Sequence, residues 1–172
     1  MQFNRRQFLS AVLVGSTGAF FYFKGQKLTL FESRVQLLLA TAYHIYPSSS
    51  FGFGAKELHL ASYLTFVLDD QRILKGDRAF LLKGPSWIEE VALKAYKKSF
   101  LILTTQEKES LLQKVVTYKW GYNYINFLFT YIFEALFSAP IYGGNPNEIG
   151  WKWAEHNPGF PQPQSKEAVS YV

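Results

Sequence analysis

The side chains that could carry out chemistry in this sequence are few and far apart. The three histidines are His44, His59 and His156, and they form neither the H-x-x-x-H nor the H-E-x-x-H spacing that places two metal ligands on one helix face. The absence of cysteine excludes disulfides, thiol nucleophiles, cysteine-ligated iron–sulfur clusters and the attachment of a c-type haem. We therefore interpret His44 and His59 as structural residues and expect no metal site.

Two acidic pairs and one glycine-rich segment also have structural explanations. Asp69–Asp70 stands at the end of a predicted helix, and Glu89–Glu90 follows Ser86 in the predicted first turn of another, where carboxylates favour the helix macrodipole. The segment FGFGAK, residues 51–56, has no strand before it and no Lys-Ser or Lys-Thr pair after it, unlike a phosphate-binding loop. Since no nucleophile has a base and an orienting partner, we expect a chain without catalytic residues of its own.

Composition indicates a single helical domain. The chain has 172 residues, of which 48% are hydrophobic and 18% aromatic, so it can fill one core and still supply aromatic side chains to an interface. The formal charge of +5 is spread over scattered lysines, which argues against nucleic-acid binding. Helical spacing predicts five helices, over residues 28–46 and 55–68, from Trp87, from a capping box at Thr104 and Glu107, and over residues 122–137.

These elements predict an all-α fold with three parts. Residues 1–25 form a signal or anchor segment, residues 26–139 a single compact helical bundle, and residues 140–172 an irregular, extended tail rich in glycine, proline and tryptophan. The segment 122–137 is apolar almost all round, so it is either the centre of the bundle or a membrane span, and its Asn and Glu residues favour the bundle.

The leader has the pattern of a bacterial twin-arginine export signal. In NRRQFLS, residues 4–10, the consensus positions are Arg5, Arg6, Phe8 and Leu9, and an apolar run continues to Phe23. This export route carries proteins that have already folded. No A-x-A cleavage site follows, so both cleavage at another position and retention as a short anchor stay open.

The tail resembles a known family. In PIYGGNPNEIGWK, the residues Tyr142, Gly143, Gly144 and Asn145 are followed by Gly150, Trp151 and Lys152, and this pattern is similar to the signature of the small subunits of membrane-associated gluconate 2-dehydrogenases, called subunit 3 or the gamma subunit. The segment LLLATAYHIYPS looks like the first helix of that family. The resemblance extends over most of the chain.

The resemblance implies a non-catalytic helical partner of a large FAD-dependent dehydrogenase subunit of the glucose–methanol–choline type, which oxidises a sugar acid or polyol. A third subunit with c-type haem accompanies many such systems. The chain itself would bind no cofactor. It would supply the signal read by the twin-arginine translocase, help its partner to mature, and remain in the periplasm, either unattached or held at the inner membrane.

The tail is the predicted partner-binding site. The residues assigned to it are Tyr142, Gly143, Gly144, Asn145, Gly150, Trp151, Trp153 and Phe160. An equally open interpretation is that these aromatic residues fold back onto the bundle. Two other functions also remain as alternatives, a membrane-anchored structural protein and a stand-alone helical enzyme or metal-binding protein.

Overall fold

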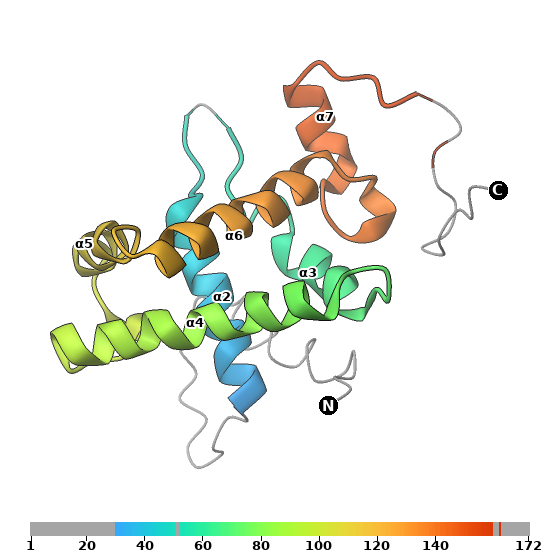
Figure 1. Cartoon of the computed structure of the whole chain (residues 1–172). Helices are drawn as coiled ribbons and strands as arrows, with labels where there is room; N and C mark the ends of the chain where they lie inside the picture. The colour runs from blue at the N-terminus through green and yellow to red at the C-terminus, as the bar shows by residue number, and fades with distance from the viewer. Residues whose placement is uncertain (1–29, 51, 160–161, 163–172) are drawn as a thin grey trace, which may run out of the picture.

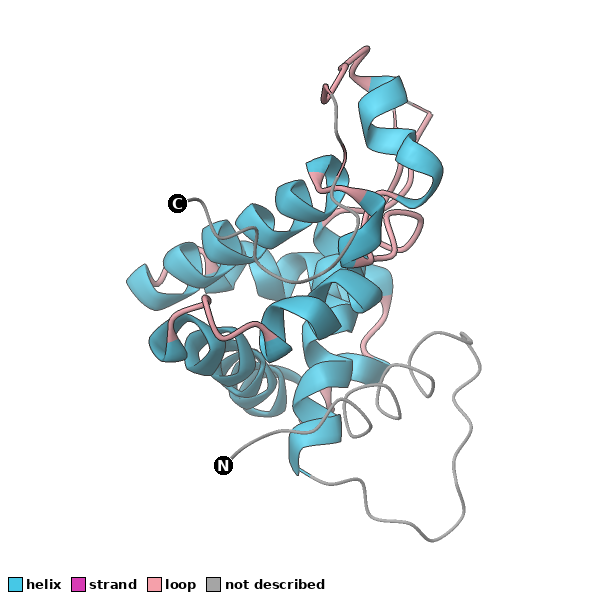
Figure 2. Cartoon of the chain, turned by 90° about the vertical axis from the view of Figure 1, so that its right-hand side faces the viewer, coloured by secondary structure: helices cyan, strands magenta, loops and turns pink. Residues whose placement is uncertain are grey.

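The computed structural model describes residues 30–50, 52–159 and 162, and confirms the all-α fold class (Figure 1). Its α-helices are α2 (Leu30–Ile45), α3 (Leu60–Asp69), α4 (Lys75–Tyr96), α5 (Thr105–Val115), α6 (Lys119–Phe137) and α7 (Ile149–Trp153). Three 3-10 turns complete the series: η1 (Phe100–Ile102), η2 (Pro140–Tyr142) and η3 (Pro146–Glu148). Within the described residues no strand forms, and the one β-type contact is an isolated bridge between Ser49 and Gly52 (Figure 2).

The core lies where α2 crosses α4 and α6. In Figure 1, α4 and α6 run side by side and α2 passes behind both, and each pair of these helices is in contact. Helix α3 also contributes to this core. The fully buried leucines of the four helices include Leu38, Leu64, Leu81 and Leu128. At one end, α5 begins with the predicted capping box, in which Thr104 and Glu107 each accept a hydrogen bond from the other's backbone N–H.

The prediction that a helix begins at Trp87, with Ser86 as its cap, is wrong. Helix α4 begins at Lys75 and continues through Pro85. A proline inside a helix removes the hydrogen bond to the carbonyl four residues earlier, which here is Leu81. The buried hydroxyl of Tyr124 donates to that carbonyl over 3.3 Å, so a partner from α6 replaces the missing bond.

Two further predictions, the position of Glu89–Glu90 and the start of the second helix, are also wrong. Glu89–Glu90 lie in the middle of α4 rather than in a first turn, and the Glu89 carboxylate accepts a hydrogen bond from the backbone N–H of Phe100 at 2.8 Å. The second helix begins at Leu60 rather than near Ala55, because His59 has a left-handed backbone with φ of 56°. Asp69 does end this helix, as predicted.

No helix in the described part of the chain is both long and apolar enough to cross a membrane. The leader residues Arg5, Arg6, Phe8 and Leu9, and Phe160 in the tail, lie outside the described residues.

Candidate partner-binding surface

The first part of the tail is folded into helical turns, which corrects the prediction of an extended strip. Pro140 and Pro146 each stand at the start of a 3-10 turn, where a proline's missing N–H has no helical partner to lose. Gly143 lies between these turns with φ of 98°, and its backbone passes against Ser62 of α3. The chain then enters α7, which is in contact with α6 and lies at the top of both views (Figures 1 and 2).

Asn145 connects this folded tail to the end of α6. Its side chain is fully buried, and its backbone is left-handed with φ of 48°. The amide nitrogen donates to the carbonyl of Ser138 at 3.0 Å, and the amide oxygen accepts from the backbone N–H of Gly150 at 2.7 Å. One side chain therefore joins the residue that follows α6 to the first turn of α7.

Gly150 and Trp151 complete the attachment. A Cβ on Gly150 would lie 2.0 Å from the carbonyl oxygen of Leu136, so the backbone of α7 approaches α6 more closely than any other residue would permit. Trp151 is buried, and its indole Nε1–H donates to the carbonyl of Phe137 at 2.8 Å. The last carbonyls of a helix have no partner inside it. The family-like tail motif thus caps the C-terminus of α6.

The side chains of Trp153 and Tyr142 are more exposed to solvent than that of Trp151. Trp153 is 53% exposed, and its indole lies 3.7 Å from the position of a Cβ at Gly52. The neighbouring Phe53 is 38% exposed. Tyr142 is half-buried, with its ring 4.8 Å from that of Phe66. Of the predicted partner-binding aromatic residues that the structure describes, Trp151 is therefore an internal anchor and Trp153 the more accessible one.

Helix α6 carries further exposed aromatic side chains that the sequence interpretation did not assign to a site. We call Tyr122, Phe129, Phe133 and Phe137 the α6 aromatic stripe. Tyr122, Phe133 and Phe137 are 59%, 47% and 44% exposed, and Phe129 is half-buried. Tyr46 packs edge-on against Phe129 and Phe133, with ring centroids 6.5 and 6.0 Å apart. The one available signal in the sequence was that this helix is apolar almost all round.

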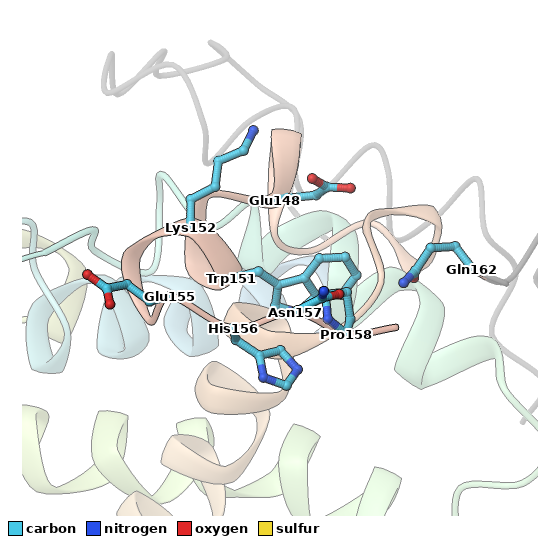
Figure 3. Close-up of a pocket in the computed structure, with 8 residues that line it drawn as sticks. All are labelled: Glu148, Trp151, Lys152, Glu155, His156, Asn157, Pro158 and Gln162. Carbon is cyan, nitrogen blue, oxygen red and sulfur yellow. The ribbon is translucent and has the colours of Figure 1, made fainter. Parts of the chain in front are cut away.

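A pocket of about 260 Å³ opens beside α7 (Figure 3). It lies over the buried Trp151, and its other lining residues are Glu148, Lys152, Glu155, His156, Asn157, Pro158 and Gln162. Acidic, basic and imidazole groups surround the opening, so its charge favours no single class of ligand. Within the described residues no group of three His, Asp or Glu side chains lies close enough to hold a metal ion.

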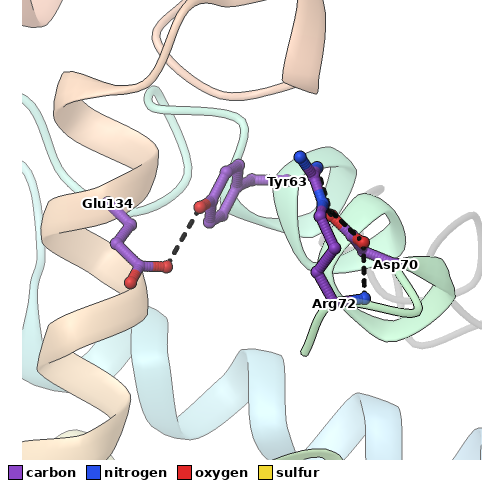
Figure 4. A network of polar contacts seen from close by, with 4 residues as sticks. All are labelled: Tyr63, Asp70, Arg72 and Glu134. Atoms are coloured by element: carbon purple, nitrogen blue, oxygen red, sulfur yellow. Dashed lines mark hydrogen bonds and ion pairs between the residues drawn. The ribbon is translucent and has the colours of Figure 1, made fainter. Parts of the chain in front are cut away.

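Two pairs of titratable side chains near this region bond to each other (Figure 4). The Tyr63 hydroxyl of α3 donates to the Glu134 carboxylate of α6 at 3.0 Å. Burial raises the pKa of Tyr63, so its hydroxyl stays protonated as the donor at neutral pH. Partial burial also raises the pKa of Glu134. Asp70 accepts from the Arg72 side chain, and this hydrogen bond lowers the pKa of the Asp70 carboxyl.

The histidines have the separate positions expected from the sequence. His44 Nε2 lies 3.2 Å from the Glu109 carboxylate, His59 is the exposed residue before α3, and His156 is part of the pocket wall. They belong to three different regions, and the structure does not bring them together.

Asn145 offers a test of the tail attachment. Asn145→Gly is expected to lower the free energy of unfolding by about 2–3 kcal/mol, because both hydrogen bonds of a buried side chain are lost. Asn145→Ala should cost about 1 kcal/mol more, since alanine must also adopt the left-handed backbone. Urea unfolding followed by circular dichroism measures both. If the glycine variant is as stable as the wild type, these two hydrogen bonds do not hold the tail.

A family model described as gluconate 2-dehydrogenase subunit 3 matches residues 32–159 of the chain. This range extends from α2 to the end of the folded tail and includes the residues that cap α6. No curated protein and no solved structure matches the chain.

Proposed function

Because the chain belongs to the family of gluconate 2-dehydrogenase subunit 3, we propose that it is the non-catalytic small subunit of an FAD-dependent dehydrogenase that oxidises a sugar acid or polyol in the periplasm. The observation that carries this proposal is the family match over residues 32–159. The flavin belongs to the large subunit, and a c-type haem, where present, to a third subunit. This chain contributes a folded surface rather than reacting groups.

The side chains of the described residues support a binding role. Tyr63 and Glu134 bond to each other, Asp70 bonds to Arg72, and His44 lies beside Glu109, so these groups serve contacts within the fold. Meanwhile several large aromatic side chains are left exposed near α6 and α7. Aromatic residues are enriched at the centres of protein–protein interfaces.

The leader supports a second part of the proposal, export of the complex. Arg5 and Arg6 precede an apolar run, as in signals read by the twin-arginine translocase. A large subunit that binds its flavin in the cytoplasm must cross the membrane already folded. The small subunit binds it there, supplies the signal for both chains, assists its maturation, and stays bound in the periplasm, with the leader either cleaved or kept as an anchor at the inner membrane.

Replacing Arg5 and Arg6 with lysine tests the export role. We expect the large subunit to accumulate in the cytoplasm, because the translocase distinguishes the arginine pair from lysines of equal charge. Fractionation of cells that express both chains, followed by flavin and activity measurements in each fraction, gives the answer.

Lys24→Arg is the matched control, since it exchanges the same two residue types elsewhere in the N-terminal segment. Co-purification from the cytoplasm shows whether the double variant still binds its partner. If the partner of the double variant reaches the periplasm as well as with the wild type, the escort role is wrong.

A further inference from the structure

The α6 aromatic stripe lies on the side of α6 that faces away from α4. Residues three, four or seven positions apart lie on the same side of a helix, so Tyr122, Phe129, Phe133 and Phe137 share one face. The opposite face contains Trp120 and Phe127, whose rings pack against aromatic residues of α4. Packing against α4 therefore explains one aromatic face of α6 and leaves the other unexplained.

Between its two exposed charged residues, Lys119 and Glu134, the exposed side of α6 is unusual for a surface in contact with water because no side chain there is charged. The exposed polar residues in that interval are Asn123, Asn126 and Thr130. The Glu134 carboxylate bonds to Tyr63 of α3. Charged residues are depleted from the centres of interfaces, whereas ordinary exposed helix faces are rich in them.

The same surface continues across two other segments. Tyr46 packs on Phe129 and Phe133, and the loop that follows it reaches α7, where Gly52 lies against the indole of Trp153. The accessible aromatic residues of this surface are Tyr122, Phe133, Phe137, Phe53 and Trp153. At about 150–250 Å² for a whole side chain, and at their exposed fractions, they present roughly 500 Å² of aromatic area.

We propose that the α6 aromatic stripe, extended by Phe53 and Trp153, is the surface on which the large flavoprotein subunit docks. This assignment rests on the proposed function. A stable interface buries about 800 Å² on each partner, and the aromatic area described above is enough to form its centre. A surface that binds lipid typically has basic side chains among its aromatic residues. The one basic residue of α6 is Lys119, at its first position, so this helix fits a protein partner better than a membrane.

Phe133→Asp in the full chain, co-expressed with the flavoprotein subunit, tests the assignment. We expect the affinity between the subunits to fall by about 30-fold or more, the loss typical of a central aromatic contact. Leu93→Asp is the matched control, because Leu93 on α4 is also 47% exposed and lies outside the stripe. The control should bind like the wild type. Phe133→Ala provides a milder variant, and circular dichroism checks that each variant is folded.

Several results would overturn the assignment. If Phe133→Asp binds the flavoprotein as tightly as Leu93→Asp does, the large subunit docks elsewhere and the proposed function stands. If the wild type itself does not bind the flavoprotein, both proposals fail. Loss of self-association in Phe133→Asp, with unchanged flavoprotein binding, would assign the stripe to a second copy of this chain. Loss of binding to phosphatidylglycerol vesicles alone would assign it to the membrane.

Discussion

Gly84→Ala is expected to lower the free energy of unfolding by about 3–5 kcal/mol, the sum of overpacking a rigid core and leaving a buried carbonyl without a partner. A Cβ at Gly84 would lie 2.1 Å from the ring of Tyr124, which is fully buried. Displacing that ring also pulls its hydroxyl away from the Leu81 carbonyl, which Pro85 leaves without a helical donor. One added methyl group therefore disturbs two contacts between α4 and α6.

Gly76→Ala is the matched control for this prediction. Gly76 also lies in α4, but nothing stands within 4 Å of its Cβ position. This change should stabilise the fold by about 0.5–1 kcal/mol, because alanine has fewer conformations to lose in a helix. Tyr124→Phe isolates the hydrogen bond and should cost about 1–3 kcal/mol. Equal urea midpoints for Gly84→Ala and Gly76→Ala would contradict the prediction. They would show that α4 and α6 can move apart at this contact at little cost in free energy.

Trp151→Ala is expected to reduce mainly the stability of the fold, and Trp153→Ala mainly the binding of the partner, although the two residues stand only two positions apart. Trp151 is 5% exposed and donates to the Phe137 carbonyl, so its removal should cost about 3–5 kcal/mol of stability, as for other buried aromatic residues. Trp153 is 53% exposed, so its removal should change stability by less than about 1 kcal/mol. The same change should weaken binding of the large subunit by about tenfold or more.

Two measurements separate these effects. Thermal unfolding of the isolated chain reports stability, and co-purification with the flavoprotein below the melting temperature reports binding. Trp151→Phe keeps most of the ring but removes the indole donor, so it should be intermediate in stability. A stable Trp151→Ala variant that fails to bind would instead make Trp151 a direct partner contact, as the sequence interpretation proposed, and would mean that the tail rearranges in the complex.

The folded tail links the family motif to the proposed docking surface. Asn145, Gly150 and Trp151 hold the end of α6 and position α7, and α7 then places Trp153 beside the loop at Gly52. The motif residues thus act through the fold. Substitution of Asn145 or Trp151 should weaken binding indirectly, through a loss of stability, whereas substitution of Phe133 or Trp153 should weaken binding with a much smaller loss of stability.

Local chemistry made part of this structure predictable from the sequence. The capping box at Thr104 and Glu107 formed as expected, since it depends on residues three positions apart. The start of α4 was predicted wrongly for the opposite reason. Pro85 is a helix breaker by local rules, and the hydroxyl that compensates for it comes from Tyr124, which is 43 residues from the Leu81 carbonyl that it bonds.

The sequence by itself determined the helical class, the family resemblance and the identity of the tail motif, because these depend on short-range spacing and composition. Only the tertiary structure decided which face of α6 stays exposed. A helix that is apolar almost all round contains no local information about which side will be covered, and packing of Phe80 and Trp87 from α4 against one side leaves the stripe on another. The same holds for the tail, where burial by α6 separates the internal Trp151 from the accessible Trp153.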